Sequence, residues 1–155
     1  MLGNDGVYQI TTTDTCSFVM KKNTPILTNY MRKYHNPYAI IIWIGQNGGF
    51  TDGEDLCDQI QRMVDYAGTD KYLVINFHTQ YFKNFNDILV KRFGKKVLDL
   101  YGAVLKIANT EQDIIDVKEG ICPSSLRADD GGHLNDVGYK MLGTLLNEKI
   151  QELNY

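Results

Sequence analysis

The sequence has few of the residues and runs that mark several common classes of protein. Its cysteines, Cys16, Cys57 and Cys122, lie far apart, and this odd, unpatterned set argues against a disulfide framework or a zinc site, so we expect reduced thiols. The net charge is -3 and no basic block occurs, which argues against nucleic acid as a partner. The longest apolar run, AIIIWI at 39–44, is far too short to span a membrane. The N-terminus lacks the basic start and apolar run of a signal peptide, so we expect a cytoplasmic protein.

The order of apolar and polar residues predicts one domain over 1–155 that is built in two parts. Residues 1–30 are rich in Thr, Val, Tyr and Phe and contain a polar break, TTDT, which predicts a short β-hairpin. From residue 38 to residue 155, strand patterns alternate with helix patterns. Such alternation predicts an α/β fold of three layers, in which a parallel sheet has helices on both sides.

The strands and helices of this α/β portion can be placed from local patterns. Continuous apolar runs predict strands at 38–45, 71–79 and 96–101, the first two buried on both faces. A helix is predicted over 51–68, because Thr51 and Glu54 have capping-box spacing and Gly68 follows an apolar stripe. Further helices are predicted at 85–94, at 110–120 with Thr110 as the cap, and at 133–153.

A candidate acid and base stand together in the glycine-rich segment 127–138, just before the last helix. Asp130 precedes His133 by three residues, and in a turn this spacing lets a carboxylate reach a ring nitrogen of the imidazole. That contact would fix the tautomer and leave the other nitrogen free to accept a proton, as in a hydrolytic triad. The alternative is that Asp130 caps a turn and His133 is a solvated loop residue.

Two other segments follow predicted strands, and in parallel sheets such segments form sites beyond the carboxyl ends of the strands. In the turn GQNGG, Gly45 allows close approach of a ligand and Asn47 could aim its amide at a developing oxyanion. The alternative for this turn is a plain connecting loop. His78 could line a pocket, or its ring could hydrogen-bond to the nearby backbone as an ordinary histidine at the end of a strand. The spacing of His78, Asp130 and His133 is not that of a metal site, and no cofactor motif occurs, so we expect neither.

The same segments carry a resemblance to a known family. IIWIGQNGG at 41–49 resembles the third conserved block, Gly-x-Asn-Asp, of the SGNH (GDSL-type) hydrolases, and DGGHLNDVGY at 130–139 resembles their fifth block, Asp-x-x-His followed by Leu-Asn and Gly-Tyr. GICPSSLRADD at 120–130 is similar to the approach to that block in bacterial members with a small β-rich insertion, and 6–30 is similar to the tail of the insertion. The resemblance covers nearly the whole chain.

This resemblance implies a flavodoxin-like sheet and a serine ester hydrolase, acting without metal on a small ester or on an acyl group carried by a carbohydrate or lipid. It implies that His133 is the general base, that Asp130 is its orienting acid, and that Asn47 donates to the oxyanion hole in a turn shaped by Gly45. A non-catalytic binding or assembly module of the same fold is the alternative. A nucleotide or phosphate binder using GQNGG is a weaker one, because no Gly-x-Gly-x-x-Gly or Gly-Lys-Ser/Thr motif occurs.

The chain departs from the family pattern at the nucleophile. It contains neither the Gly-Asp-Ser first block nor the second block, and Gly48 stands where the third block usually has aspartate. The only serines are Ser17, in the expected hairpin, and Ser124 and Ser125, which follow Pro123 in the loop before the histidine. The nucleophile is therefore unknown from the sequence.

The missing first block also predicts a sheet that is incomplete on one side. In a flavodoxin-like order the first strand lies beside 39–44, so this run would be an exposed apolar edge that needs a cover. Three alternatives could cover this edge: the N-terminal segment 7–13 or 16–20, a second copy of the chain in a homodimer, or an upstream segment that bears the serine. The third would also allow secretion.

Overall fold

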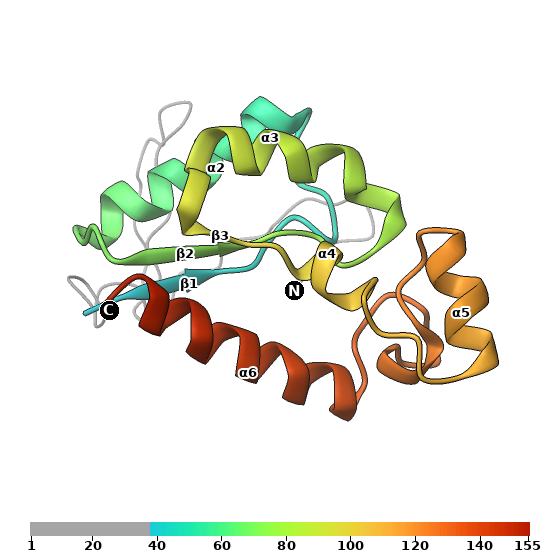
Figure 1. Ribbon diagram of the computed structural model, residues 1–155. Coiled ribbons are helices and arrows are strands. Elements are labelled where there is room, and N and C mark those ends of the chain that lie inside the picture. Colours follow the sequence, from blue (N-terminus) through green and yellow to red (C-terminus); the bar gives the residue numbers. More distant parts are fainter. Residues whose placement is uncertain (1–37) are drawn as a thin grey trace, which may run out of the picture. The chain divides into compact units, whose positions relative to one another are not determined.

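The computed structural model describes residues 38–155, which all belong to one compact unit, Tyr34–Tyr155. The hairpin expected over 1–30, together with Cys16 and Ser17, lies outside the described residues. The described part is α/β, with a parallel sheet of three strands in the order β1-β2-β3. Figure 1 shows two long helices over one face of this sheet and the C-terminal helix along the other face.

The three strands are shorter than the apolar runs that predict them. They are β1 (Ile40–Ile42), β2 (Tyr72–Ile75) and β3 (Val97–Leu98). Ile41 pairs with Leu73, and Val74 pairs with Val97. The third strand ends early because Asp99 caps the short helix α4 (Leu100–Val104) through the N–H of Gly102.

The first expected strand is not buried on both faces. Ile42 is 6% exposed, but its neighbour Ile41 is 49% exposed. The reason is topological, since β1 is an edge strand of the described sheet and pairs only with β2. By contrast, β2 lies in the middle, and its residues Leu73, Val74 and Ile75 are buried.

The helices connect the strands and then complete the fold. They are α2 (Gly53–Ala67) between β1 and β2, α3 (Lys83–Phe93) between β2 and β3, then α4, α5 (Glu111–Lys118) and α6 (Asp136–Glu152). Their apolar stripes face the sheet and form two clusters of buried side chains. One includes Leu56, Ile60, Val74 and Leu89, and the other includes Ile75, Leu98, Leu126, Leu134 and Leu142.

The helix ends confirm the caps predicted at Gly68 and Thr110 and correct the predicted starts of two helices. Thr110 caps α5 in a capping box with Asp113, as expected. The box predicted from Thr51 and Glu54 is wrong, because Asp52 is the N-cap of α2 and accepts from the N–H of Asp55. Aspartate is a somewhat better cap than threonine, which favours the register one residue later. The last helix begins at Asp136 rather than near 133, because Asn135 caps it through the N–H of Gly138.

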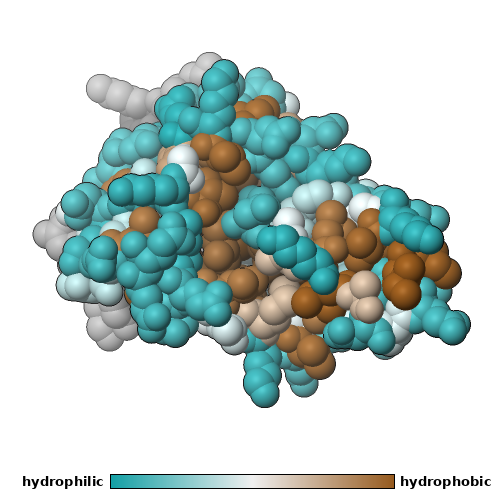
Figure 2. Space-filling view, in the orientation of Figure 1, coloured by the Kyte–Doolittle hydropathy of each residue, from teal (hydrophilic) through white to brown (hydrophobic). Residues whose placement is uncertain are grey.

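Apolar side chains are not confined to these clusters. Ile114 and Ile115 are exposed on α5, and Figure 2 shows apolar colour on the side of the molecule that α5 forms.

Two of the three cysteines, Cys57 and Cys122, are buried free thiols, as expected. No helix within 38–155 is long and apolar enough to cross a membrane.

Candidate active site

The turn before α6 brings the predicted acid and base into direct contact. Asp130 Oδ1 accepts hydrogen bonds from the N–H of Gly132 at 2.9 Å and of His133 at 3.0 Å. Asp130 Oδ2 lies 2.6 Å from His133 Nδ1. One carboxylate therefore caps the turn and also contacts the imidazole. The turn cap and the contact with His133, which were alternatives in the sequence, are both present in the structure.

The contact also favours the ionised form of Asp130. The hydrogen bond with the His133 side chain, helped by the two backbone N–H groups, lowers the pKa of Asp130 from 3.8 to about 2. An ionised carboxylate can only accept, so the hydrogen of this contact lies on His133 Nδ1, and Nε2 is the ring nitrogen that Asp130 does not engage. The side chains of His133 and Asp130 are 65% and 57% exposed, so the pair stands at the surface and not in the core.

His133 opens onto a cavity of about 520 Å³ that lies beyond the carboxyl ends of the strands. The cavity is formed by the segment after β1, the segment after β2, and the turn and first residues around the start of α6. Four residues named from the sequence line it: Gly45, Asn47, His78 and His133. The imidazole and the amide of the glycine turn thus share one cleft, while Asp130 supports His133 from outside the lining.

Gly45 is required by the shape of its turn. Its φ is +96°, in the left-handed region, and a Cβ there would meet Phe77 Cζ at 3.0 Å and Leu56 Cδ1 at 3.2 Å. The N–H of Gly48 donates to the carbonyl of Gly45 at 2.9 Å, which closes the turn around Asn47. The backbone therefore places residues 46 and 47 at the mouth of the cavity.

Gln46 is a site residue that the sequence pattern does not reveal. Its Nε2 donates to the carbonyl of Gly132 at 2.8 Å and lies 3.4 Å from His78 Nδ1. This amide joins the turn after β1 to the turn that holds His133, across a sequence separation of 86 residues. The only signal in the sequence is that Gln46 lies in the glycine-rich turn GQNGG, directly after a predicted strand.

His78 lies beneath this amide and is only 1% exposed. Burial lowers the pKa of His78 from 6.5 to about 4, so the ring is neutral at neutral pH. Its Nε2 has no hydrogen-bond partner, and neither do Trp43 Nε1 nor Thr79 Oγ1, which are also buried. Lining the cavity and bonding to the backbone both fit this position, because a backbone hydrogen bond with Gly132 acts to raise the His78 pKa against the effect of burial.

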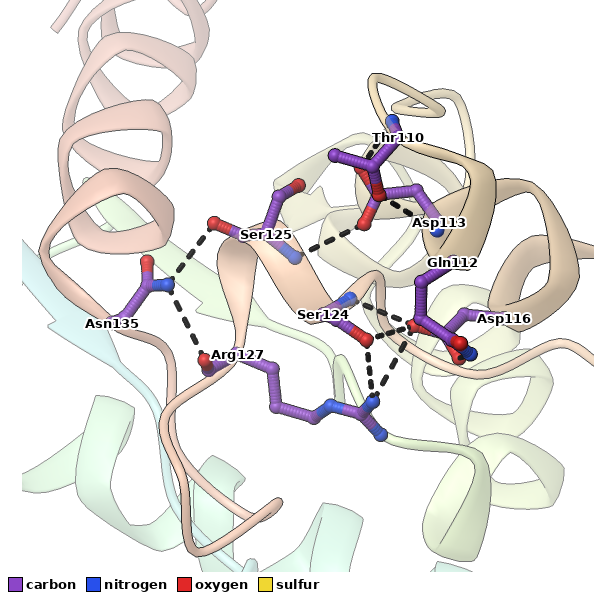
Figure 3. Close-up of polar contacts among 8 residues, drawn as sticks. All are labelled: Thr110, Gln112, Asp113, Asp116, Ser124, Ser125, Arg127 and Asn135. Atoms are coloured by element: carbon purple, nitrogen blue, oxygen red, sulfur yellow. Dashed lines mark hydrogen bonds and ion pairs between the residues drawn. The ribbon is translucent and has the colours of Figure 1, made fainter.

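The serines within 38–155, Ser124 and Ser125, lie in the loop before His133, and the hydroxyl of Ser125 is buried without a hydrogen-bond partner. Ser124 donates its hydroxyl to Asp116 Oδ2 at 2.5 Å, and its N–H reaches the same oxygen at 2.8 Å. The N–H of Ser125 donates to Asp113 Oδ1 at 3.0 Å. Figure 3 shows the Ser124 hydroxyl on Asp116 with Arg127 beside it, and Ser125 joined to Asp113 through its backbone N–H. Neither serine lines the cavity.

This network holds the loop that leads to His133. Burial acts to raise the pKa of Asp116, but hydrogen bonds from Ser124 and Gln112 outweigh it and hold the pKa below its ordinary value. Asn135 then ties the loop to α6 by donating from Nδ2 to the carbonyls of Ser125 at 3.0 Å and Arg127 at 3.3 Å. The role of Ser124 and Ser125 here is to hold the loop.

Cys122 is no better as a nucleophile, because burial raises the pKa of its thiol to about 11. Within 38–155, no group of three or more His, Cys, Asp or Glu side chains is placed to hold a metal ion. No protein-family model, curated protein or solved structure matches the chain. The geometry of the cavity and of the Asp130–His133 pair is therefore the evidence from which a function is argued.

Proposed function

We propose that this chain carries the base, the orienting acid and one oxyanion donor of an SGNH-type serine ester hydrolase, and that the serine comes from outside residues 38–155. The observation that carries the proposal is the 2.6 Å contact between Asp130 and His133, with His133 and Asn47 lining one cavity. The parallel order β1-β2-β3 supports it, because it fits the last three strands of a flavodoxin-like sheet.

The chemistry follows from the free nitrogen of His133. A serine Oγ would attack the acyl carbon while His133 Nε2 takes its proton, and Asp130 would stabilise the imidazolium that forms. The Asn47 amide would donate to the carbonyl oxygen as it becomes an oxyanion. When the bond from carbon to the alcohol oxygen breaks, the imidazolium returns the proton to the leaving alcohol. Water, activated by the same nitrogen, then releases the acid and regenerates the serine.

Within residues 38–155, β1 pairs only with β2, so its other edge offers the place for a strand that would bring the serine. Ile41 is 49% exposed there, and the cavity begins at Trp43, just beyond the end of β1. A parallel strand beside β1 would end at the same edge of the sheet, next to Asn47 and His133. Pairing of two copies through 39–44 is the competing use of this edge, and a gel-filtration mass equal to the monomer would count against it.

The test is to supply the nucleophile and follow hydrolysis of p-nitrophenyl acetate. The chain as given should turn over little ester, because without nucleophile and base together only weak residual catalysis is expected. Joining a segment that ends a strand with Gly-Asp-Ser ahead of residue 1 should raise the rate. That gain should be lost in His133→Gln and fall about 10²–10⁴-fold in Asp130→Asn, while the neighbouring exposed control Asp129→Asn should keep it.

Two outcomes would contradict the proposal. One is robust turnover by the chain alone that disappears in His133→Gln but survives replacement of Ser17, Ser124 and Ser125. The other is that no serine-bearing strand restores turnover although the joined protein is folded. The second outcome would favour a non-catalytic binding module, which the hydrogen bond of the Ser124 hydroxyl to Asp116 also supports.

A further inference from the structure

The turn that holds His133 is exposed and rich in glycine. Gly131 has a φ of +71°, and a Cβ on Gly132 would meet only Asp130 Oδ1, at 3.9 Å. Two adjacent glycines give a backbone many accessible conformations. The side chains of His133 and Asp130 are 65% and 57% exposed, so they add little packing. A fixed position for the imidazole therefore needs a restraint from another part of the fold.

One hydrogen bond supplies such a restraint from the other side of the cavity. Gln46 Nε2 donates to the carbonyl of Gly132 at 2.8 Å, and among residues 38–155 no other hydrogen bond joins segment 43–50 to segment 127–135. The amide can bind only in this orientation, because its own oxygen would repel the carbonyl oxygen. The bond thus links the turn that carries Asn47 to the turn that carries His133.

The acceptor of this bond belongs to the peptide group that leads into His133. The carbonyl of Gly132 is one end of that group, and the N–H of His133 is the other and donates to Asp130 Oδ1 at 3.0 Å. A trans peptide group is planar, and its C=O and N–H point in opposite directions. Gln46 and Asp130 therefore hold one rigid plane from its two edges, and this plane sets φ of His133.

The donor is held more firmly than the acceptor. Gln46 follows Gly45, and the N–H of Gly48 closes their turn by donating to the Gly45 carbonyl at 2.9 Å. His78 Nδ1 lies 3.4 Å from Gln46 Nε2, and His78 is only 1% exposed, so the amide also rests on the buried segment after β2. One side chain thereby connects the ends of two strands to the exposed turn.

We propose that Gln46 is a positioning residue for the general base: its amide holds the peptide group before His133 so that the imidazole and the Asn47 amide face the same point of the cavity. This inference rests on the proposed function for the role of His133, and it adds a residue that acts only through the backbone of His133. A misplacement of about 1 Å in a catalytic group can lower a rate about 10²-fold, so one neutral hydrogen bond here can govern turnover.

The first test needs no catalysis and uses the full-length chain. Gln46→Met keeps the length of the side chain without a donor, and Gln46→Glu keeps its shape but places an acceptor against the carbonyl of Gly132. In amide relaxation NMR, the N–H order parameters of Gly132 and His133 should fall from about 0.85 to below about 0.6 in both variants. The matched control is Gln59→Met, which removes a 2.8 Å bond to the carbonyl of Gly49 and should leave both order parameters unchanged.

The second test uses the protein joined to a serine-bearing strand. Gln46→Met should lower kcat for p-nitrophenyl acetate about 10- to 100-fold and leave KM within about twofold, because the cavity keeps its walls while the base loses its position. Gln59→Met should keep both constants. A residue that only fills space would show neither effect in Gln46→Met.

Three outcomes would overturn the inference. One is that the order parameters of Gly132 and His133 stay high in Gln46→Met and Gln46→Glu, and another is an unchanged kcat in the joined Gln46→Met protein. The third is loss of the cooperative thermal transition in both variants, which would make Gln46 a residue of the fold as a whole and not of the base.

The two proposals fail in different ways. A joined protein without turnover, in a chain whose order parameters respond to Gln46→Met, would remove the hydrolase and keep Gln46 as the residue that places His133. Turnover that Gln46→Met leaves unchanged would keep the hydrolase and remove the positioning role.

Discussion

Replacing Asp116 should show how strongly the buried network holds the loop before His133. Asp116 is 4% exposed, and its Oδ2 accepts from the N–H and the hydroxyl of Ser124 and lies 3.4 Å from Arg127 Nη2. Its Oδ1 accepts from Gln112 Nε2 at 3.0 Å. Asp116→Ala removes every one of these acceptors and leaves a partly buried guanidinium beside an unpaired N–H.

The magnitude follows from what each variant leaves unpaired. Hydrogen bonds to charged groups contribute about 1.5–3 kcal/mol each, and breaking a buried ion pair costs about 3–5 kcal/mol. Arg127 is a quarter exposed and can regain water, so we expect Asp116→Ala to lower the free energy of unfolding by about 3 kcal/mol. Asp116→Asn should cost about 1–2 kcal/mol, because its oxygen can still face Ser124 while the Gln112 amide turns over.

Urea unfolding followed by circular dichroism measures both losses. With a slope of about 2 kcal/mol per molar, a 3 kcal/mol loss moves the midpoint by about 1.5 M. Glu119→Ala, an exposed acid at the end of the same helix, is the control and should stay within about 0.5 kcal/mol of the parent protein. If Asp116→Ala matches Glu119→Ala, or if Asp116→Asn costs more than Asp116→Ala, the account of this network is wrong.

Three further predictions follow from the shifted pKa values. In a carbon-detected NMR titration, Asp130 should titrate at about 2, and His133→Gln should raise its midpoint toward 3.8, because the imidazole contact is the largest cause of the shift. For His78 the pKa in the folded state, about 4, lies below its ordinary value of 6.5, so the unfolded chain binds a proton at a higher pH than the folded chain does. The free energy of unfolding should therefore fall by about 3 kcal/mol as the pH drops from 6.5 to 4. A His78→Gln variant whose stability in urea unfolding depends on pH with the same slope as the parent protein would refute this. Cys122, with a thiol pKa of about 11, should react with Ellman's reagent at pH 8 only on unfolding, measured in a Cys16→Ala background, and fast labelling of the folded protein would contradict its burial.

The sequence predicts the helices well, because their signals are local. The apolar stripe of α2 and its end at Gly68 depend on residues within a few turns of one another, and Thr110 caps α5 through a side chain three residues away. The strands are predicted in kind and order but not in length. Whether Ile41 is covered depends on which strand lies beside it, and that is not a property of the run AIIIWI itself.

The candidate site divides in the same way. The contact between Asp130 and His133 spans three residues, and this spacing permits it without excluding a turn cap beside a solvated histidine. The bond from Gln46 to Gly132 spans 86 residues and has no periodic signature. The free polar atoms of Trp43 and Thr79 become visible only when burial and partners are known. Local spacing therefore indicates which side chains can meet in the turn, and long-range packing determines what surrounds them.

The bond between Gln46 and Gly132 places very different demands on its two ends. The acceptor is a main-chain carbonyl, which every amino acid possesses, and a Cβ on Gly132 would meet only Asp130 Oδ1 at 3.9 Å. The donor is a side-chain amide of one particular length, and asparagine is one methylene shorter. In a library randomised at both positions and selected for a folded site, position 132 should diversify freely while position 46 returns to glutamine.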